Sequence, residues 1–536
     1  MATEKMTSLL SNITYGASPL DTITQKNPDD IVITLAIRTP MCRYKTGSLS
    51  DTPLDALVLK TLEQVRLRSK LNPALVEDIC LGNVRDGQAA QFGRAAALAA
   101  GFPNTTGACR VNRFCSSGLA ATQNIANEIA AGSIDIGERF QTGYHLVDGI
   151  AVGAESLSTP NTRLDRPFVD EIMNANQDAR DCMQEMGQTS ENVARDFGIS
   201  RQKQDEFALV SNNRAEAAQR AGWFDDEIVP ITTHKDGKEI VVNKDEIRYG
   251  TTYERLSKLR PAFPEHGDRS TAGNSSQITD GAAAVLLMKR SKALELGQPI
   301  VAKYVGTAVA GVPPRIMGIG PVFAIPKLLS RYNLSLQRDI DVVEINEAFA
   351  SMAVYCKDKL EIEWSKLNPR GGAIALGHPV GCTGARQIVT GLSECRRRGV
   401  KVLLTSMCMG SGMVSTTPLP WRWNLSADYD VRGWPVSLSM NVYEPAGFRE
   451  VVIGPRVAFG RVKYVRWIGW REAYSQGVVR YLPYPIAIQL ALASHMVLAL
   501  ANVPLSWTAS RADGESSVTK STSYLPNPAE AVRHRT

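Results

Sequence analysis

The sequence has neither the cysteine spacing nor the histidine clustering of a metal site. Its nine cysteines are scattered without a CxxC pair, and none of its six histidines forms a ligand-like group with them. Tetrahedral zinc sites normally draw their ligands from such closely spaced pairs, so we expect no bound metal. An odd number of widely separated cysteines also argues against a disulfide framework. We therefore expect reduced thiols in an intracellular protein.

Charge of one sign is not concentrated anywhere in the chain. The net charge of +6 arises from 60 basic and 54 acidic residues, which are mixed along the 536 residues. Without a dense basic block, nucleic-acid binding has no support, although a modest positive balance would help to attract an anionic ligand. The N-terminus also lacks the basic-then-apolar layout of a secretory signal.

Long hydrophobic runs are also scarce. The one run that approaches the length of a membrane span, Pro485 to Val503, is interrupted by Gln489, His495 and Asn502. These polar residues favour a segment that does not cross a membrane. Glycine-rich turns are present, but their spacing is not GxGxxG, so a dinucleotide site is not predicted.

Short β-branched runs alternate with stretches of helical periodicity, which indicates an α/β fold. In the first part of the chain, strands are predicted at 31–36, 76–82, 150–156 and 279–288, and helices at 54–67, 93–101 and from Cys115 to about 131. The alternation restarts at Ile300, with strands at 301–309, 340–345 and 400–406 and helices at 321–332, 348–360 and from the turn at 371–384 to about 398. Each half thus places a turn of small residues before a helix, at Cys115 and at His378, and two similar halves facing one another would bring these turns together.

Composition divides the chain into five segments. We expect a flexible arm at 1–29, a first α/β domain at 30–157 that is completed by 279–297, and a second α/β domain at 298–413. A mixed lobe at 158–278 is inserted between them, and an atypical tail follows at 414–536. Within the lobe, one helix is predicted near Ser190–Phe197 and another from Ser200, its N-cap, to about Ala221.

Two stretches do not match their surroundings. Deletion of Glu138–Gly149 (ERFQTGYHLVDG) would leave a continuous strand, IDIG-IAVGAES. The tail opens with Val414 and soon reaches Pro418 and Pro420, which we expect to be excluded from a central sheet. We predict that both stretches are extra translated sequence, with a genuine surface loop as the alternative for 138–149. Splice junctions are then expected near 138–149 and 414.

The first candidate for chemistry is Cys115, in the run Val111-Asn112-Arg113-Phe114-Cys115-Ser116-Ser117-Gly118. The small residues after it suit the first turn of a helix, whose positive end would lower the pKa of the thiol and favour a nucleophilic thiolate. A buried cysteine that acts as a small apolar residue is the alternative. This stretch alone leaves both interpretations open.

Three further motifs contain residue types that suit chemistry. Asn346-Glu347 follows a buried strand, where α/β proteins often place site residues, although Asn346 could equally be a helix cap. His378 lies between Gly377 and Pro379, in a turn with few bulky neighbours that allows close approach to a ligand. Cys408 ends a strand and precedes Gly410, whose backbone N–H is available as an oxyanion donor; an inert core thiol is the alternative.

Together these motifs resemble the thiolase family, and among its members the peroxisomal-type 3-ketoacyl-CoA thiolases (acetyl-CoA C-acyltransferases). The motifs that carry the resemblance are NRFCSSG at 112–118, AGNSSQ at 272–277, NEAFAS at 346–351, NPRGGAIALGHPVGCTGARQ at 368–387 and SMCMGSGM at 406–413. The resemblance covers residues 30–413 apart from 138–149. It implies the five-layered αβαβα thiolase fold, built from two related α/β halves with a loop domain over the site.

The resemblance also implies a role for each matching residue. Cys115 would carry the acyl group, His378 would activate its thiol, and Cys408 would exchange a proton with the α-carbon of acetyl-CoA. Asn346 would hold a water that, with His378, stabilises the enolate-like oxygen, and the backbone N–H groups of Cys115 and Gly410 would form a second oxyanion hole. Ser276 and Met186 match positions that line the pantetheine channel in relatives.

This set meets the needs of cleaving a 3-ketoacyl thioester: a soft nucleophile, a proton source and donors for two oxyanions. It requires no metal or redox cofactor, and CoA and acyl-CoA are the implied partners. The resemblance further implies a homodimer and a role in fatty-acid β-oxidation in the peroxisome. A targeting signal is only weakly matched by Lys5-Met6 and Asn12-Ile13, so mitochondrial and cytoplasmic locations are the alternatives.

Two other functions are compatible with the same residues. A biosynthetic acetoacetyl-CoA thiolase would run the reaction in the condensing direction, although the motif wording favours the degradative type. A catalytically impaired homologue is the other alternative, because the chain departs from the family directly after Cys408. Ketosynthases share the fold but lack the second cysteine, so Cys408 argues against them.

Overall fold

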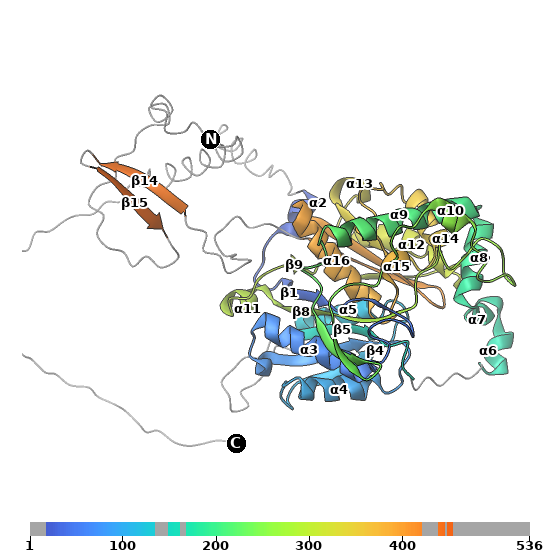
Figure 1. Cartoon of the computed structure of the whole chain (residues 1–536), viewed down its shortest axis with the longest axis horizontal. Coiled ribbons are helices and arrows are strands. Elements are labelled where there is room, and N and C mark those ends of the chain that lie inside the picture. The colour runs from blue at the N-terminus through green and yellow to red at the C-terminus, as the bar shows by residue number, and fades with distance from the viewer. Residues whose placement is uncertain (1–17, 134–147, 161–167, 421–437, 445–446, 454–536) are drawn as a thin grey trace, which may run out of the picture. The chain divides into compact units, whose positions relative to one another are not determined.

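The computed structural model describes residues 18–133, 148–160, 168–420, 438–444 and 447–453 (Figure 1). The chain forms two compact units, residues 1–429 and 430–536. The described part of the second unit is an antiparallel hairpin of β14 (Leu438–Glu444) and β15 (Gly447–Ile453). None of the helices in the described ranges is long and apolar enough to cross a membrane, and the apolar run at 485–503 lies outside those ranges.

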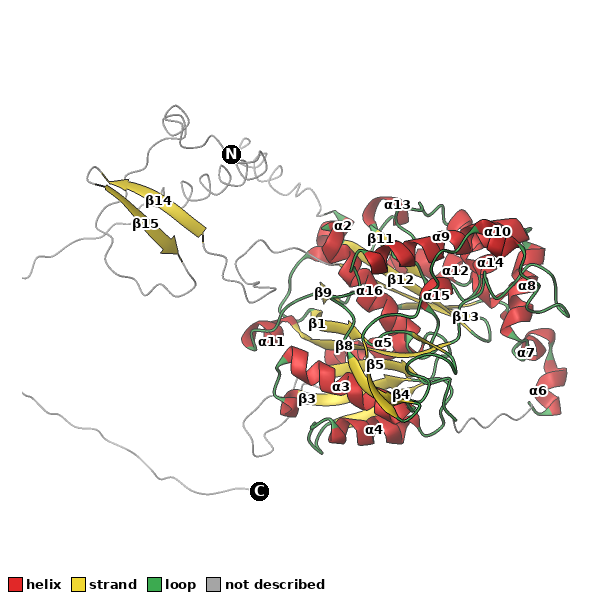
Figure 2. Cartoon of the chain, viewed as in Figure 1, coloured by secondary structure: helices red, strands yellow, loops and turns green. Residues whose placement is uncertain are grey.

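The first α/β domain is built on a seven-stranded mixed sheet (Figure 2). Its strands follow the order β4-β3-β5-β8-β1-β9, and β2 pairs with β8. The strands are β1 (Ile31–Arg38), β2 (Cys42–Arg43), β3 (Val76–Gly82), β4 (Gly107–Val111), β5 (Asp148–Glu155), β8 (Thr279–Lys289) and β9 (Ala302–Lys303). The helices are α3 (Leu54–Ser69), α4 (Ala89–Ala99), α5 (Ser117–Ala131) and α11 (Arg290–Glu295), with a 3₁₀ turn η1 (Pro73–Leu75).

The second domain has a four-stranded sheet in the order β10-β13-β12-β11. Its strands are β10 (Ala308–Gly311), β11 (Val342–Ile345), β12 (Val402–Met409) and β13 (Met413–Pro420). Its helices are η2 (Pro314–Ile319), α12 (Pro321–Arg331), α13 (Leu336–Asp339), α14 (Ala350–Lys359), α15 (Ala373–Leu376) and α16 (Thr383–Arg398). The strand predicted at 301–309 is therefore two strands, of which β9 pairs in the first sheet and β10 in the second.

Alternation along the strands explains the layers, because successive side chains point to opposite faces of a sheet. In β8, Leu286 packs into the cluster beneath α3 whereas Leu287 packs against α5 and α16. In β12, Leu403 faces the same α5–α16 layer whereas Leu404 packs against α12 and α14. Both sheets are thus buried on both faces, with α5 and α16 between them. The order is the predicted αβαβα.

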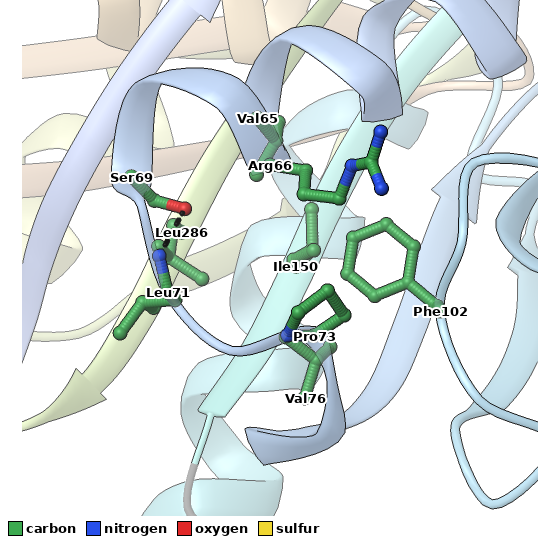
Figure 3. Close-up of a pocket in the computed structure, with 9 residues that line it drawn as sticks. All are labelled: Val65, Arg66, Ser69, Leu71, Pro73, Val76, Phe102, Ile150 and Leu286. Atoms are coloured by element: carbon green, nitrogen blue, oxygen red, sulfur yellow. Dashed lines mark hydrogen bonds between the residues drawn. The ribbon is translucent and has the colours of Figure 1, made fainter.

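The cluster beneath α3 is the largest part of the first domain's core. It includes Val65, Phe102, Ile150 and Leu286. Figure 3 shows that these apolar side chains also line a small recess at the end of α3, beside Arg66 and Ser69. The recess lies on the outer side of the first sheet and contains none of the predicted site residues.

Residues 168–278 form the mixed lobe. It contains α6 (Asp170–Ala175), α7 (Gln177–Asp181), α8 (Met186–Asp196), α9 (Arg201–Arg220), the hairpin β6 (Ile231–Lys235) and β7 (Lys238–Val242), and α10 (Tyr253–Ser257). The predicted N-cap of α9 is confirmed, since the Ser200 hydroxyl accepts a hydrogen bond from the N–H of Lys203 at 3.2 Å. Both helices predicted in the lobe are present.

The N-terminal arm is shorter than predicted. Residues 19–24 form helix α2 (Pro19–Thr24), whose first turn is capped because the Ser18 hydroxyl accepts from the N–H of Asp21 at 3.1 Å. Ile23 is buried in the core cluster that contains Ile325 and Leu329 of α12. The buried contact of Ile23 therefore holds α2 against the second domain, although the polar composition of this segment predicted a flexible arm. Residues 1–17, including the weak targeting match, lie outside the described part.

The prediction that prolines exclude the start of the tail from the sheet is wrong for residues 414–420. β13 pairs with β12 along its whole length, with Pro418 opposite Leu404 and Pro420 opposite Val402. On its other side, β13 pairs with β10 only from Met413 to Thr416. Both prolines lie beyond that second ladder, where the lack of an N–H donor is tolerated. The second domain therefore extends to residue 420, and the tail begins after it.

The atypical stretch in the first domain is also shorter than predicted. Asp148 and Gly149 belong to β5, where Asp148 lies opposite Val76 of β3 and Met288 of β8. The side chain of Asp148 is fully buried, and neither carboxylate oxygen has a hydrogen-bond partner among the described residues. Residues 138–147 lie outside the described part. β5 thus begins on a buried, unpaired carboxylate, which is a poor residue for a core strand.

Candidate active site

Cys115 lies in a tight turn between β4 and α5. Ser117 closes the turn, because its hydroxyl donates to the carbonyl of Phe114 at 2.6 Å and accepts from the N–H of Arg113 at 2.9 Å. Phe114 adopts a left-handed backbone conformation with φ of 46°, which is uncommon for a bulky residue and typical of functional turns. The helix begins two residues after Cys115. The predicted helix-start position of the thiol is confirmed.

The loop between β12 and β13 approaches the same thiol. Positive φ angles of 62° at Ser411 and 77° at Gly412 close this hairpin. The backbone N–H groups of Gly410 and of Cys115 itself both interact with the Cys115 sulfur. The ring of Phe114 lies alongside Gly410, where a Cβ atom would already be 3.4 Å from the ring. Two backbone donors therefore converge on the position of the thiol.

Asn346, His378 and Cys408 form a buried cluster. The Asn346 Nδ2 atom lies 3.4 Å from His378 Nε2 and 3.5 Å from Cys408 Sγ. The Asn346 Oδ1 atom is buried and has no hydrogen-bond partner in the described part of the chain, so the amide keeps one polar atom for a ligand or a water. The cluster draws one residue from the end of β11, one from the turn before α16 and one from β12. The structure thus brings together residues that are up to 62 positions apart in the sequence.

Burial keeps the titratable groups of this cluster in their neutral forms. Burial raises the pKa of Cys408 to about 12, although the Asn346 amide opposes this shift. Burial, assisted by the positive charge of Arg386, lowers the pKa of His378 to about 3. His378 is therefore a neutral imidazole at physiological pH, which is the form that can accept a proton.

The sequence-based expectation of a lowered pKa for Cys115 is wrong. Burial is the largest influence and raises the pKa of the thiol, and the nearby Cys408 and Glu155 raise it further. The two backbone N–H groups lower it by less. The helix start does supply donors at the thiol, but the loss of hydration outweighs them. Cys115 therefore needs a base to become a thiolate.

Close backbone contact between α5 and α16 brings the two halves of the site together. At Gly384, a Cβ atom would lie 2.5 Å from the backbone nitrogen of Leu119. At Gly118, it would lie 2.8 Å from the backbone nitrogen of Ala385 and from the carbonyl oxygen of Gly381. Only glycine permits such an approach. The small residues around Cys115 and His378 thus serve the packing of the two helix starts as well as ligand access.

Glu155 ties the His378 turn to the first domain. Its carboxylate accepts hydrogen bonds at 3.0 Å from the backbone N–H groups of Val84, Arg85 and Gly381. Burial raises the pKa of Glu155 to about 7, and these three donors act in the opposite direction. A buried carboxylate at the end of β5 therefore fixes the loop that carries His378.

Glu347 performs a similar task on the second domain. It accepts hydrogen bonds at 2.7 Å from the Ser211 hydroxyl of α9 and from Asn368 Nδ2, and at 3.1 Å from the N–H of Ile374. The sequence places Glu347 beside Asn346 but indicates no role for Glu347. Glu155 does not stand out in the sequence either. Their partners are distant in the chain, so no local pattern reveals them.

The two predicted channel residues lie near the cluster. Met186, at the start of α8, packs against the apolar group of Met317, Ala348, Phe349, Met352 and Cys408. Ser276 donates its backbone N–H to the carbonyl of Ala348 at 3.0 Å. The lobe thus contributes a partly exposed apolar wall beside Cys408. A long, flexible apolar ligand could lie against this methionine-rich wall.

Potential metal ligands do not gather at this site. Within the described ranges, the group of side chains that could hold an ion is Glu185, Glu265 and His266, of which both glutamates are exposed. None of the cysteines belongs to that group. The absence of a metal from the chemistry stays a prediction.

The arrangement defines a class of site. Two thiols, one neutral imidazole and two convergent backbone N–H groups provide a nucleophile, a base, an acid and an oxyanion hole. Such a set is suited to acyl transfer through a cysteine acyl-enzyme.

Comparison with known proteins agrees with this class. Residues 31–291 match the family model of the thiolase N-terminal domain, and residues 298–419 match that of the thiolase C-terminal domain. The chain is 49% identical over 407 residues to the peroxisomal 3-ketoacyl-CoA thiolase of Yarrowia lipolytica, an alignment covering 74% of this chain and 94% of that one. It is 47% identical to the human peroxisomal 3-ketoacyl-CoA thiolase, covering 73% of this chain and 90% of that one.

Solved structures give the same result. The crystal structure of the dimeric peroxisomal thiolase of Saccharomyces cerevisiae covers 75% of this chain and all of its own, with 42% identity and a TM-score of 0.68. A second structure of that yeast's peroxisomal 3-ketoacyl-CoA thiolase, described as five-layered, covers 74% of this chain and 99% of its own, with 37% identity and a TM-score of 0.61. The chain belongs to the thiolase family. Its C-terminal match ends at residue 419, which agrees with the extent of β13.

Proposed function

We propose that the protein cleaves 3-ketoacyl-CoA with CoA, giving acetyl-CoA and an acyl-CoA that is two carbons shorter. The observation that carries the proposal is the contact of Asn346 with both His378 and Cys408, beside a thiol that receives two backbone N–H groups. These groups correspond to the two oxyanions and the two proton transfers that the reaction requires. The names of the relatives at 47% and 49% identity support the same substrate class.

The first half-reaction transfers the acyl group to Cys115. His378 Nε2 takes the thiol proton, and the thiolate attacks the C3 keto carbon. The N–H groups of Cys115 and Gly410 stabilise the alkoxide that forms there. When this intermediate collapses, the C2–C3 bond breaks and its electron pair goes to the acetyl-CoA enolate. Asn346, through a water, and His378 stabilise the enolate oxygen, and Cys408 gives its proton to C2.

The second half-reaction returns the acyl group to CoA. The Cys408 thiolate takes the proton of the incoming CoA thiol, and the CoA sulfur attacks the acyl-enzyme. The same two backbone N–H groups stabilise the second tetrahedral intermediate, and Cys115 departs as a thiolate that recovers its proton from His378. Every proton is thus exchanged between side chains and substrate. We propose that no metal or redox cofactor takes part.

The structure weakens the case for an impaired homologue. That alternative depended on a chain that leaves the family directly after Cys408, whereas residues 413–420 complete the sheet beside it. The biosynthetic alternative uses the same residues. The curated relatives at 49% and 47% identity are named 3-ketoacyl-CoA thiolases, which favours the degradative assignment.

We also propose a homodimer in the peroxisome. Among the described strands, β4 lies at one edge of the seven-stranded sheet and its side chains are exposed or only partly buried, so this edge suits pairing with a second copy. The yeast relative is described as dimeric, and the curated relatives from Yarrowia lipolytica and human are described as peroxisomal.

A thiolysis assay tests the proposed function. Purified full-length protein, mixed with CoA, should consume acetoacetyl-CoA and longer 3-ketoacyl-CoA esters and release one acetyl-CoA for each ester consumed. Turnover of acetoacetyl-CoA alone would favour the biosynthetic alternative. No turnover of any ester by a well-folded sample would overturn the proposal.

A further inference from the structure

We propose that Thr383 is a positioning residue that keeps the proton of the His378 imidazole on Nδ1 and so leaves Nε2 free to act as the base. The inference rests on the proposed function, in which Nε2 accepts the proton of Cys115. Thr383 lies within the motif that carries the family resemblance, but it takes no part in the acyl-transfer steps themselves.

The hydrogen bonds of the Thr383 hydroxyl carry the inference. Thr383 is fully buried at the start of α16. Its Oγ1 atom lies 2.6 Å from His378 Nδ1 and 3.1 Å from the carbonyl oxygen of Pro379. A hydroxyl has one hydrogen to donate, and a carbonyl oxygen can only accept. The hydrogen therefore goes to Pro379, and Oγ1 accepts the hydrogen of Nδ1–H.

The opposite tautomer conflicts with both neighbours of the ring. If the hydroxyl donated to Nδ1, its oxygen would face the Pro379 carbonyl oxygen at 3.1 Å with no hydrogen between them. On the other side of the ring, Asn346 Nδ2 lies 3.4 Å from Nε2 and has only hydrogens to offer. A bare Nε2 accepts one of them, whereas Nε2–H would place two donors together.

The tautomer decides which nitrogen can take a proton. Because burial lowers the pKa of His378 to about 3, the resting ring is neutral and carries one proton. With that proton on Nδ1, the lone pair of Nε2 faces the buried cluster of Asn346 and Cys408. With the proton on Nε2, the basic nitrogen would face Thr383, away from the reacting atoms. A group that orients a catalytic histidine in this way is a recurrent part of acyl-transfer sites.

Substitution of Thr383 by valine isolates this role. Valine has nearly the same shape, and the Pro379 carbonyl keeps two donors, the backbone N–H groups of Cys382 at 2.8 Å and of residue 383 at 3.1 Å. The group that loses its partner is then His378 Nδ1. Thr61 provides a matched control, since it is fully buried in α3 and its hydroxyl donates at 2.8 Å to the carbonyl of Leu57, four residues earlier.

The first readout is the thiolysis kinetics of the full-length protein. We expect Thr383→Val to lower kcat by about 10- to 100-fold, the range typical for partners that orient metal-bound histidines, and to change KM by less than about twofold. Thr383→Ser should restore kcat because it restores the hydroxyl, and Thr61→Val should behave like the unmodified protein. A Thr383→Val variant with unchanged kcat, or a kcat that serine does not restore, would overturn the inference.

The second readout does not require turnover. In protein labelled with ¹⁵N at its histidine rings, the His378 signals can be assigned by their loss in His378→Ala. We expect a protonated Nδ1 and a bare Nε2 in the unmodified protein and in Thr383→Ser, and a shift toward protonated Nε2 in Thr383→Val. Protonated Nε2 in the unmodified protein would contradict the inference. An Nδ1–H tautomer in a protein without thiolysis would instead contradict the proposed function alone.

Discussion

The hydroxyl oxygens of Ser116 and Ser415 lie 2.5 Å apart in the buried interior, so a hydrogen bond joins the turn that carries Cys115 to strand β13. Ser415 pairs with Met407 of β12 on one side and with Val309 of β10 on the other. β13, which its prolines were expected to exclude from the sheet, therefore supports the turn that carries Cys115.

Truncation should distinguish β13 from the tail beyond it. A chain ended after Tyr429 keeps the whole first unit, and we expect it to fold and to retain thiolysis within about twofold. A chain ended after Gly412 lacks β13 and leaves the edges of β10 and β12 unpaired, so we expect it to be insoluble. Soluble expression and thiolysis rates would check both. A fully active 1–412 chain would contradict the role of β13. Because β13 extends to Pro420, the splice junction is expected near 421 rather than 414.

Gly384→Ala tests the close contact of the two helices. A Cβ atom 2.5 Å from the backbone nitrogen of Leu119 must force α5 and α16 apart, at a cost of about 1–3 kcal/mol. We expect a lower denaturation midpoint together with a reduced kcat, because the same contact places Cys115 near His378. At Gly311, the nearest atom to an added Cβ is 4.0 Å away. Gly311→Ala is thus the control, and equal losses in both variants would contradict the explanation.

Asp148 should make stability depend on pH. Burial raises the pKa of its carboxyl from 3.8 to about 7 in the folded protein. A raised folded pKa means that stability is full below about pH 4 and is lost as the pH rises toward 7, by roughly 4 kcal/mol at most. Asp148→Asn should therefore gain more in urea midpoint at pH 8 than at pH 5.

The exposed residue Asp29 offers the control for that comparison. Asp29→Asn should shift the urea midpoint equally little at both pH values. If Asp148→Asn gave the same gain at pH 5 and pH 8, ionisation of Asp148 would not be its cause. Deletion of 138–149 should stabilise the protein at least as much, because it replaces this aspartate by Ile136 in the strand predicted from the sequence.

Asn346→Ala should affect the reaction more than binding. The amide contacts the base and the acid of the proposed mechanism at 3.4 and 3.5 Å, and removal of one such donor typically lowers kcat about 10²- to 10³-fold. KM should change little. Asn212 is also buried, but its amide donates at 2.8 Å to the carbonyl of Ala208 within its own helix. An Asn212→Ala variant that lost as much kcat would argue for general destabilisation.

The sequence predicts the parts of the structure that depend on local pattern. The predicted bounds of β3 are correct, and those of β1, α3, α9 and α12 agree with the structure to within about two residues. Apolar periodicity and helix caps are local signals, which is why these elements can be predicted. The motifs around Cys115, Asn346, His378 and Cys408 are enough to indicate the family, and Asn346 contacts both His378 and Cys408. The site roles assigned to them stay predictions.

The features that the sequence could not predict depend on contacts between distant residues. Pro418 and Pro420 are tolerated because β10 is shorter than β13, which no pattern within 413–420 reveals. The raised pKa of Cys115 results from burial by both halves of the fold. The role inferred for Thr383 also depends on Asn346, which contacts the His378 ring from 32 positions away in the sequence. In each case the deciding partner is set by the tertiary structure.

The most direct test of the account is to locate the acyl group. Full-length protein mixed with acetoacetyl-CoA in the absence of added CoA should release about one acetyl-CoA per site, and peptide mass spectrometry should find an acetyl group on Cys115. Cys115→Ser should give neither, whereas Cys182→Ser, which changes a partly exposed cysteine outside the cluster, should give both. An acetyl group on Cys408 or on another residue, or a full burst from Cys115→Ser, would contradict the account.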